Sequence, residues 1–317
     1  MPFKTVLEKT SLAVNSTATL LKNEFGSIEL FNLNNSSDNG NLKGLRFIHK
    51  NGHGSVSLYG GQVLTWQPTN QQPVFWLSQA SNYDDTHAIR GGVPICWPWF
   101  GGDVKLSDGN TVKTSNHGFA RQSQWQLDDI DISESAVIIT LSLSGENFSS
   151  LWPEKFKLSQ RLLFSEQFQQ ALTMTNLSDH TVEYTGALHS YFCISSPQQS
   201  NINSLGLVEF DDKLSGEYSQ LATLDSCTGP IDRIYHSSHQ QRIVDLAWQR
   251  EIVVSSKNCA QWVMWNPGSA VASSMADMHL HSENEFVCLE AANTKFQAIA
   301  SQESLSISQK VTISRLS

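Results

Sequence analysis

The stretch AVIITLSLS, residues 136–144, alternates apolar side chains with the hydroxyl-bearing side chains of threonine and serine. Successive side chains of a β-strand point to opposite faces, so this period of two is typical of a strand with one buried face. The same period recurs in FQQALTMTN, residues 168–176, and along residues 305–313. The pattern therefore predicts several half-buried antiparallel strands, the last of which closes a sheet.

Helical periodicity is nearly absent from the 317 residues. The best candidate is a short turn or helix around Ser274–Met278, which follows the breaker Asn266-Pro267-Gly268. Many strands with few helices are typical of a β-sandwich or barrel. Because the sequence has neither a fixed-period repeat nor a break in composition, we expect an all-β fold in a single domain spanning residues 1–317.

The chain carries a formal net charge of −9, and only 16% of its residues are charged. A negative protein repels the phosphates of nucleic acids and the headgroups of anionic membranes, so we expect neither as a partner. The sequence identifies no protein partner. An anionic small molecule would have to be bound by a local group of basic residues, which makes individual arginines informative.

The cysteines are odd in number, widely spaced and free of any C-x-x-C pair; they are Cys96, Cys193, Cys227, Cys259 and Cys288. This usage favours a reducing compartment. The first twenty residues contain no apolar leader segment, and no run of about eighteen apolar residues occurs anywhere in the sequence. We therefore expect a cytoplasmic protein that neither enters the secretory pathway nor spans a membrane.

Two stretches supply candidate anion ligands. AIRGGVPICWPWFG, residues 88–101, combines Arg90 with glycines and prolines that shape a rigid, irregular loop. NHGFARQSQW, residues 116–125, adds His117 and Arg121. Two guanidiniums beside irregular loops predict a clamp for an oxyanion, although each arginine could instead form a surface ion pair. Trp97 and Trp99 are either platforms for a sugar or part of the core.

Two further stretches supply groups for proton transfer. In TVEYTGALHSYF, residues 181–192, alternation places His189 and Tyr191 on the face opposite the more apolar one. A histidine there is either an acid–base group or a structural hydrogen-bond partner. In EFVCLEAAN, residues 285–293, Glu290 lies in an apolar run, where it is either a base with a raised pKa or half of a buried ion pair. Asp232 follows a Gly-Pro turn and either binds hydroxyls or caps the turn.

Metal and nucleotide chemistry find little support in the sequence. The histidine pairs in HSSH, residues 236–239, and HLH, residues 279–281, lack further ligands at zinc-site spacing. The sequence contains no G-x-S-x-G motif, P-loop or dinucleotide-binding glycine pattern. We therefore expect no metal or nucleotide cofactor and no serine hydrolase activity.

The motifs RGGVPICWPWFG, NHGFAR, ALHSYF, DRIY, VMWNPG and FVCLEAAN follow one another in this order. From about Tyr59 to the C-terminus, the chain thereby resembles the glucose-6-phosphate 1-epimerase family, the phosphosugar branch of the aldose 1-epimerases. The resemblance implies an isomerase built as one large antiparallel β-sandwich of the galactose-mutarotase type. It also implies an active site on a concave sheet face, a phosphorylated hexose as substrate, and no metal or organic cofactor.

The resemblance also implies roles for individual residues. The matching catalytic positions are His189 and Glu290, and the matching substrate-binding positions are Arg90, Asn116, His117, Arg121 and Asp232. In the implied reaction, the imidazolium of His189 protonates the ring oxygen while the carboxylate of Glu290 removes the anomeric hydroxyl proton. The sugar ring opens to the aldehyde, rotates about C1–C2 and recloses as the other anomer. The alternatives are an epimerase of unphosphorylated aldoses such as galactose and a non-catalytic sugar-binding sandwich.

Overall fold

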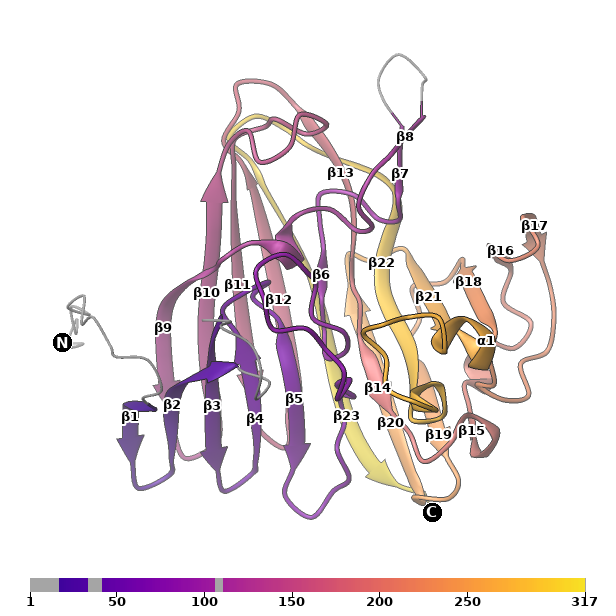
Figure 1. The fold of residues 1–317 in the computed structure, drawn as a ribbon, viewed down its shortest axis with the longest axis horizontal. Helices are drawn as coiled ribbons and strands as arrows, with labels where there is room; N and C mark the ends of the chain where they lie inside the picture. The colour runs from indigo at the N-terminus through magenta and orange to yellow at the C-terminus, as the bar shows by residue number, and fades with distance from the viewer. Residues whose placement is uncertain (1–16, 34–41, 106–110, 317) are drawn as a thin grey trace.

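The computed structural model describes residues 17–33, 42–105 and 111–316, and its strands pair in antiparallel sheets (Figure 1). This arrangement confirms the predicted all-β, antiparallel fold. Residues 1–16, which carry part of the localisation prediction, lie outside the described residues. Within the described ranges, no helix is long and apolar enough to cross a membrane.

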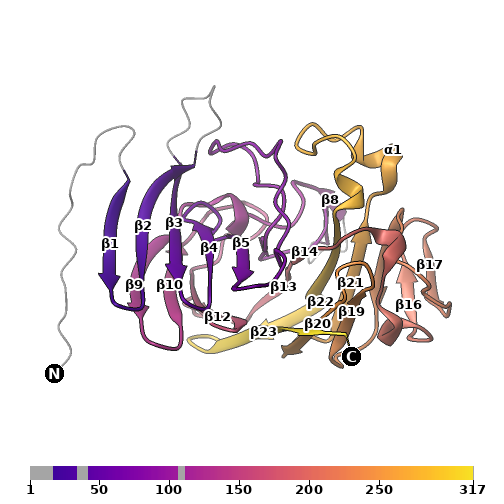
Figure 2. The same ribbon diagram turned by 90° about the horizontal axis from the view of Figure 1, so that it is seen from below.

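An eight-stranded sheet, which we call the backing sheet, forms one layer of the molecule (Figure 2). In order across the sheet, its strands are β15 (Ser200–Asn201), β19 (Gln241–Asp245), β20 (Arg250–Lys257), β23 (Ser304–Arg315), β12 (Gln167–Asn176), β11 (Phe156–Phe164), β10 (Val137–Gly145) and β9 (Gln126–Ile132). The three stretches with the predicted period of two form β10, β12 and β23. The sandwich therefore contains the strands that the sequence pattern indicates.

Two sheets form the other layer. The first contains β1 (Ala18–Asn23), β2 (Gly26–Leu33), β3 (Leu42–His49), β4 (Gly52–Ser57) and β5 (Val63–Pro68) in chain order. The second, which we call the site sheet, contains β17 (Glu217–Gln220), β16 (Phe210–Asp212), β18 (Ile231–Tyr235), β21 (Gln261–Asn266), β22 (Phe286–Ile299), β13 (Val182–Leu188) and β6 (Ile95–Cys96). A further short strand, β14 (Tyr191–Cys193), also pairs with β22.

The remaining elements are short. They are the hairpin of β7 (Asp103–Lys105) and β8 (Thr111–Lys113), the helix α1 (Gly268–Ala272), and the 3₁₀ turns η1 (Ala120–Gln122), η2 (Pro197–Gln199), η3 (Asn203–Leu205) and η4 (Ser282–Asn284). The helix begins directly after Pro267, and residues 274–278, which the sequence predicted as the helix or turn, lie beyond its end and include turns.

One prediction about topology is wrong, because β23 does not close a sheet. It lies inside the backing sheet and pairs with β12 on one side and β20 on the other. The alternation of residues 305–313 shows which face of the strand is buried, but it contains no information about the strands on either side. The hydrogen bonds to β12 and β20 are set by the topology of the whole chain.

Apolar side chains from both layers interlock to form one core. Phe47 of β3 packs against Phe164 of β11 with ring centroids 4.5 Å apart, and Trp66 of β5 packs against Phe168 of β12 at 5.8 Å. Aromatic pairs at these separations bury large apolar areas and add favourable ring contacts. The backing sheet thus packs against the opposite layer and holds it in place.

Side chains along β22 alternate between the core and the opposite face of the site sheet. Val287 and Leu289 belong to the core between the layers, whereas the intervening Cys288 and the following Glu290 point to the opposite face. A strand that is buried on both faces has apolar residues on both, which explains the apolar run around Glu290. The carboxylate is therefore held by a strand that is anchored in the core.

Gly92 in the irregular loop allows the backbone to lie close to the backbone of Val63, Trp76 and Tyr191. Its φ is +63°, and a Cβ atom there would lie 2.0 Å from the carbonyl oxygen of Val63. Its own N–H donates to the carbonyl of Trp76, and its carbonyl accepts from the N–H of Tyr191. The predicted rigid loop is thus tied both to the five-stranded sheet and to the site sheet.

We expect Gly92→Ala to lower the free energy of unfolding by more than about 2 kcal/mol, because left-handed strain of about 1–2 kcal/mol adds to a backbone clash. Urea denaturation measures the loss. Gly101→Ala is the matched control, since Gly101 has a φ of +84° but nothing within 4 Å of its missing Cβ. Equal losses in the two variants would show that the close approach at Gly92 contributes nothing.

Candidate active site

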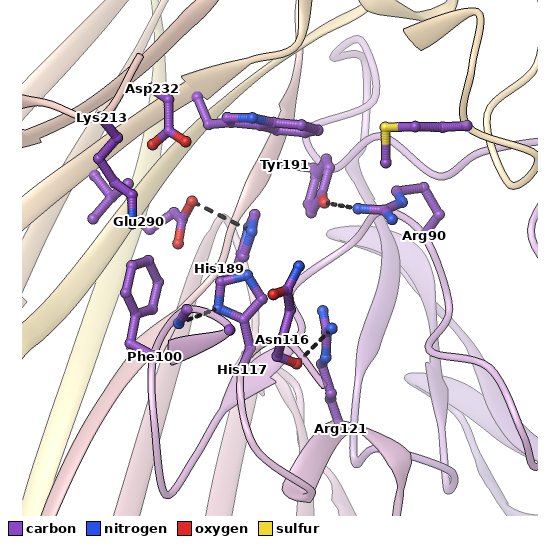
Figure 3. A pocket seen from close by; sticks show the side chains of 15 residues that line it. Arg90, Phe100, Asn116, His117, Arg121, His189, Tyr191, Lys213, Asp232 and Glu290 are labelled. Carbon is purple, nitrogen blue, oxygen red and sulfur yellow. Dashed lines mark hydrogen bonds and ion pairs between the residues drawn. The ribbon is translucent and has the colours of Figure 1, made fainter. Parts of the chain in front are cut away.

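A cavity of about 320 Å³ opens on the outer face of the site sheet (Figure 3). Its walls come from the irregular loops and from β18, β21 and β22, and its lining residues are Arg90, Phe100, Gly101, Gly102, Asn116, His117, Arg121, His189, Tyr191, Lys213, Asp232, Val263, Trp265, Met275 and Glu290. All seven residues that the sequence suggested for catalysis or substrate binding lie in this lining. Residues up to 200 positions apart in the chain therefore meet in one cavity.

His189 and Glu290 form the centre of the cavity. The Nε2 atom of His189 lies 3.4 Å from Oε1 of Glu290, and the two residues are only 6% and 1% exposed. His189 lies in the break between β13 and β14, where its N–H donates to the carbonyl of Pro94. Glu290 is paired with Val263 in the β21–β22 ladder. Backbone hydrogen bonds of the site sheet therefore fix both members of the pair.

The prediction of two faces around His189 is confirmed. Val182, Leu188 and Phe192 belong to the main core, whereas His189 and Tyr191 line the cavity. The stretch is nevertheless two strands rather than one, because β13 ends at Leu188 and β14 begins at Tyr191.

Burial and nearby charges shift the proton affinities of the pair in opposite directions. Burial, together with the guanidiniums of Arg121 and Arg90, lowers the pKa of His189 well below its usual value. Burial and the carboxylate of Asp232 raise the pKa of Glu290 well above its usual value. In the free protein, these directions favour a neutral imidazole beside a protonated carboxyl group over an imidazolium–carboxylate pair.

Arg90 is held in place at one end of the cavity. Its Nε and Nη2 atoms donate to Oδ2 of Asp277 at 3.0 and 2.9 Å, and its Nη1 donates to the hydroxyl of Tyr191 at 3.0 Å. Asp277 comes from the segment after α1. The carboxylate offsets the charge of Arg90 and occupies the edge of the guanidinium formed by Nε and Nη2. The edge formed by Nη1 and Nη2 carries more N–H groups than its one hydrogen bond to Tyr191 uses.

Arg121 differs from Arg90 because no carboxylate in the described ranges lies within ion-pair distance of it. Its Nη2 donates to the backbone carbonyl of Asn116 at 2.7 Å, and its buried Nε has no hydrogen-bond partner among the described residues. Burial lowers its pKa from the usual value. Arg121 therefore brings an uncompensated positive charge to the cavity.

Tyr191 connects the arginine end of the cavity to the central pair. Its hydroxyl accepts the hydrogen bond from Arg90, while its ring stacks on the imidazole of His189 with centroids 4.8 Å apart and an interplanar angle of 7°. One side chain thus contacts both a candidate anion ligand and a candidate acid–base group.

Asn116 and His117 form part of the opposite wall. The backbone of His117 has a φ of +68°, its Nδ1 accepts from the N–H of Gly101 at 3.1 Å, and its ring meets that of His189 edge-on at 5.4 Å. Burial, with the charge of Arg121, lowers the pKa of His117 well below its usual value. A neutral His117 beside the polar side chain of Asn116 is suited to hydrogen bonds with hydroxyl groups.

Asp232 and Lys213 lie on the other side of Glu290 from the arginines (Figure 3). Asp232 lies on β18, and its carbonyl accepts from the N–H of Lys213 at 2.9 Å. Burial raises the pKa of Asp232, and the positive charge of Lys213 acts against this rise. The cavity therefore has positive charge on both sides of the central pair.

Sequence reasoning missed Lys213, Trp265 and Met275 as parts of the site. Lys213 lies in a polar turn, and Met275 lies in the stretch predicted as a short turn or helix. Neither stretch indicates that its side chains face a cavity. Trp265 lies within VMWNPG, but the motif does not show which face of β21 it occupies. Tyr191 could have been found, because the period of two places it on the His189 face.

Trp97 and Trp99, which the sequence left open, belong to the packed interior. Both are almost fully buried, and neither lines the cavity. The ring of Trp97 packs against those of Trp152 and Phe156 at 4.6 and 4.8 Å, and the indole nitrogen of Trp99 donates to the carbonyl of Ser115. The aromatic side chains that face the cavity are those of Phe100, Tyr191 and Trp265.

The histidine pairs at residues 236–239 and 279–281 belong to other contacts. His236 pairs with Asp211, and His279 pairs with Glu285. In the part of the chain that the structure describes, neither pair belongs to a group of three potential metal ligands.

A model of the aldose 1-epimerase family matches residues 45–314. A protein of Escherichia coli K12, provisionally named glucose-6-phosphate 1-epimerase, is 30% identical over 267 residues, which are 82% of this chain and 87% of that protein. A Haemophilus influenzae protein with the same provisional name is 32% identical over 235 residues, covering 74% of this chain and 78% of that protein.

Solved structures agree with these matches. The crystal structure of YeaD from Salmonella typhimurium, provisionally assigned as a mutarotase, superposes with a TM-score of 0.80 at 27% identity, covering 92% of this chain and 94% of that one. A galactose mutarotase-like protein from Clostridium acetobutylicum superposes with a TM-score of 0.72 at 17% identity, covering 93% and 100%. These superpositions confirm the galactose-mutarotase type of sandwich.

Proposed function

The chain belongs to the aldose 1-epimerase family, and from this we propose that it is a mutarotase of hexose 6-phosphates that interconverts the α and β anomers of glucose 6-phosphate. The observation that carries the choice of a phosphorylated substrate is Arg121. A guanidinium without a carboxylate partner, facing a cavity beside Arg90, favours an anionic ligand. In a protein of net charge −9, such a local positive field is unusual.

The geometry of the central pair supports ring opening by acid–base catalysis. The ring oxygen and the anomeric hydroxyl are bonded to the same carbon atom, so the groups that protonate one and deprotonate the other must lie close together. The separation of 3.4 Å between His189 and Glu290 meets this requirement. One group donates a proton to the ring oxygen while the other accepts the hydroxyl proton, and both exchange roles when the ring recloses.

A bound phosphate favours the imidazolium form of His189, which is the acid of the proposed reaction. Burial, and after it the charges of Arg121 and Arg90, lower the pKa of His189 in the free protein. A phosphate dianion bound to these guanidiniums offsets their field, which favours the imidazolium. Binding of the phosphate therefore shifts His189 toward its acidic form. An unphosphorylated sugar brings no such charge.

We expect the pKa of His189 to rise when glucitol 6-phosphate binds, because two negative charges nearby stabilise the imidazolium over the imidazole. This acyclic dianion binds without reacting. NMR titration of histidine-labelled protein measures the shift, and His189→Ala identifies the signal. Glucitol is the uncharged control and should leave the pKa unchanged. An unchanged or lower pKa with the phosphate would refute the electrostatic coupling.

Polarimetry of the approach to anomeric equilibrium tests the proposed function. We expect kcat/KM for glucose 6-phosphate to exceed the values for glucose and galactose by at least about tenfold, since one charge-assisted contact is worth about 1.5–3 kcal/mol. A preference for galactose would instead support an epimerase of unphosphorylated aldoses. Binding without any acceleration would support a sugar-binding protein.

A further inference from the structure

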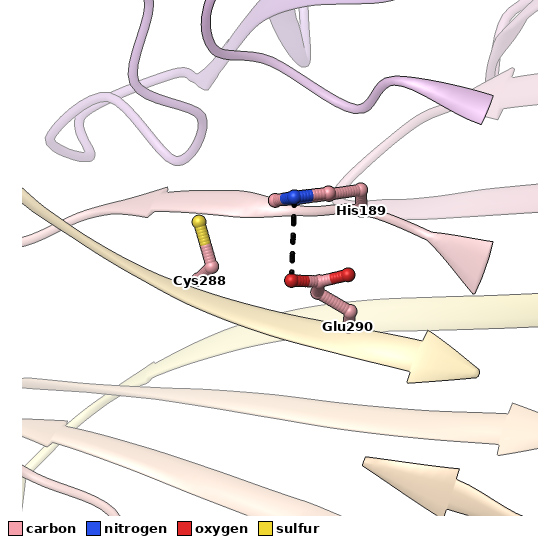
Figure 4. A group of neighbouring side chains, drawn as sticks. All are labelled: His189, Cys288 and Glu290. Carbon is pink, nitrogen blue, oxygen red and sulfur yellow. Dashed lines mark ion pairs between the residues drawn. The ribbon is translucent and has the colours of Figure 1, made fainter. Parts of the chain in front are cut away.

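Cys288 lies beside the central pair and has no part in the proposed reaction. Nε2 or Nδ1 of His189, Sγ of Cys288 and a carboxylate oxygen of Glu290 all lie within 4.8 Å of one another, and all three residues are buried (Figure 4). Among the described residues, no other group of three histidine, cysteine or carboxylate side chains brings its ligand atoms this close together. We propose that these three side chains form an inhibitory binding site for a thiophilic divalent cation of the zinc and cadmium class.

The backbone holds the three ligands together. Cys288 and Glu290 are two residues apart on β22 and therefore point to the same face. Cys288 is paired with Tyr191 of β14 on one side and with Trp265 of β21 on the other. His189 lies two residues before the first residue of β14 and is anchored by its hydrogen bond to Pro94. The ligand atoms are thus positioned by a central strand and its neighbours rather than by mobile loops.

The separations suit a tetrahedral ion. Zinc bonds to nitrogen and oxygen of about 2.0–2.2 Å place these two ligand atoms about 3.4 Å apart, and a zinc–sulfur bond of about 2.3 Å places the sulfur about 3.6 Å from each. His189 and Glu290 already show the first separation, at 3.4 Å. The group as a whole spans at most 4.8 Å, so the thiol has to approach by no more than about 1 Å. The cavity leaves the fourth position open to water.

The second observation concerns Glu290. Its side chain is almost fully buried, yet its Oε2 atom has no hydrogen-bond partner among the described residues. A buried oxygen without a partner has a free lone pair at the floor of the cavity. The ion displaces the thiol proton and the carboxyl proton to solvent, and the thiolate and the carboxylate then balance its two positive charges. A mixed set of nitrogen, sulfur and oxygen donors selects zinc or cadmium over magnesium and calcium, which prefer oxygen.

Occupation of this site would stop the reaction, a consequence that rests on the proposed function. The ion takes the lone pairs of His189 and Glu290 that proton transfer requires. It would also lie where the anomeric carbon has to sit. Zinc is therefore expected to act as a dead-end inhibitor, whose effect EDTA reverses, whereas EDTA alone leaves the activity of the metal-free protein intact.

Cobalt binding tests the site without reference to activity. We expect Co²⁺ added to EDTA-treated, desalted full-length protein to give a thiolate-to-cobalt absorption band, which Cys288→Ser abolishes. Cys96→Ser is the matched control, because Cys96 is also buried near Glu290 but lies outside the group. Absence of the band in the unaltered protein, or its persistence in Cys288→Ser, would overturn the site. Its loss in Cys96→Ser alone would do the same.

Inhibition provides the second readout. The concentration of Zn²⁺ that halves activity should rise by at least about tenfold in Cys288→Ser, since loss of even an outer partner of a metal ligand costs 10–100-fold in affinity. Equal sensitivity of the two proteins would overturn the inhibitory role. If the protein fails to act on sugar phosphates at all, the proposed function is lost, and the cobalt band still decides whether the site exists.

Discussion

Glu290→Gln is expected to lower the turnover of glucose 6-phosphate by at least about a hundredfold, because a positioned proton-transfer group contributes about 10²–10⁴-fold. Glutamine has nearly the same volume as glutamate and fills the same space beside His189, but it cannot exchange a proton with the sugar. The fold should be retained, since the amide can keep the contact of Oε1 with His189, and Oε2 has no hydrogen-bond partner to lose among the described residues. Steady-state kinetics gives the turnover, and circular dichroism confirms the fold.

His189→Ala should cause a loss of the same order for the same reason. Glu283→Gln is the matched control, because Glu283 is also a buried glutamate on the site-sheet side of the molecule but does not line the cavity. Its turnover should stay close to that of the unaltered protein. Near-normal turnover in Glu290→Gln or His189→Ala would remove that residue from the acid–base pair.

Arg121→Ala is expected to raise KM for glucose 6-phosphate by at least about tenfold, because a charge-assisted hydrogen bond of about 1.5–3 kcal/mol is lost and 1.4 kcal/mol corresponds to one decade. Arg90→Ala should have the smaller effect. Asp277 already offsets the charge of Arg90, whereas Arg121 has no carboxylate partner among the described residues. The phosphate lies away from the reacting carbon, so the loss should fall mainly on binding.

The useful quantity is the ratio of kcat/KM for glucose 6-phosphate to that for glucose. It should fall in both arginine variants, with glucose itself little affected. Arg242→Ala serves as the control, because Arg242 forms an ion pair with Glu251 and is not part of the cavity lining. An unchanged ratio in the double variant would mean that neither arginine recognises the phosphate.

The strands and cavity-facing positions that the sequence predicted are those with a local signal. The period of two around Val137 and Phe168 follows from the geometry of a single strand, and it predicts the strand without knowledge of its neighbours. Alternation likewise separates His189 from the core side of β13. Glu290 is conspicuous because a carboxylate in an apolar run requires a special environment.

The features that the sequence could not give depend on contacts between distant segments. Arg90 and Asp277 are 187 positions apart, and nothing in either stretch indicates that they form an ion pair. The position of β23 inside the backing sheet depends on pairing with β12 and β20. Trp97 and Trp99 lie in the same loop as Arg90, yet their side chains pack inward. The family resemblance supplied the positions of the site residues, while the structure alone shows which charges remain uncompensated.

Saturation-transfer NMR on glucose 6-phosphate at anomeric equilibrium tests the central claim most directly, since it measures the exchange between the α and β forms without a coupling enzyme. With a catalytic amount of the protein, saturation of one anomeric proton should pass to the other well above the rate in buffer. The same amount of Glu290→Gln should give the buffer rate. If the unaltered protein transfers no more saturation than buffer does, it is not a mutarotase of glucose 6-phosphate.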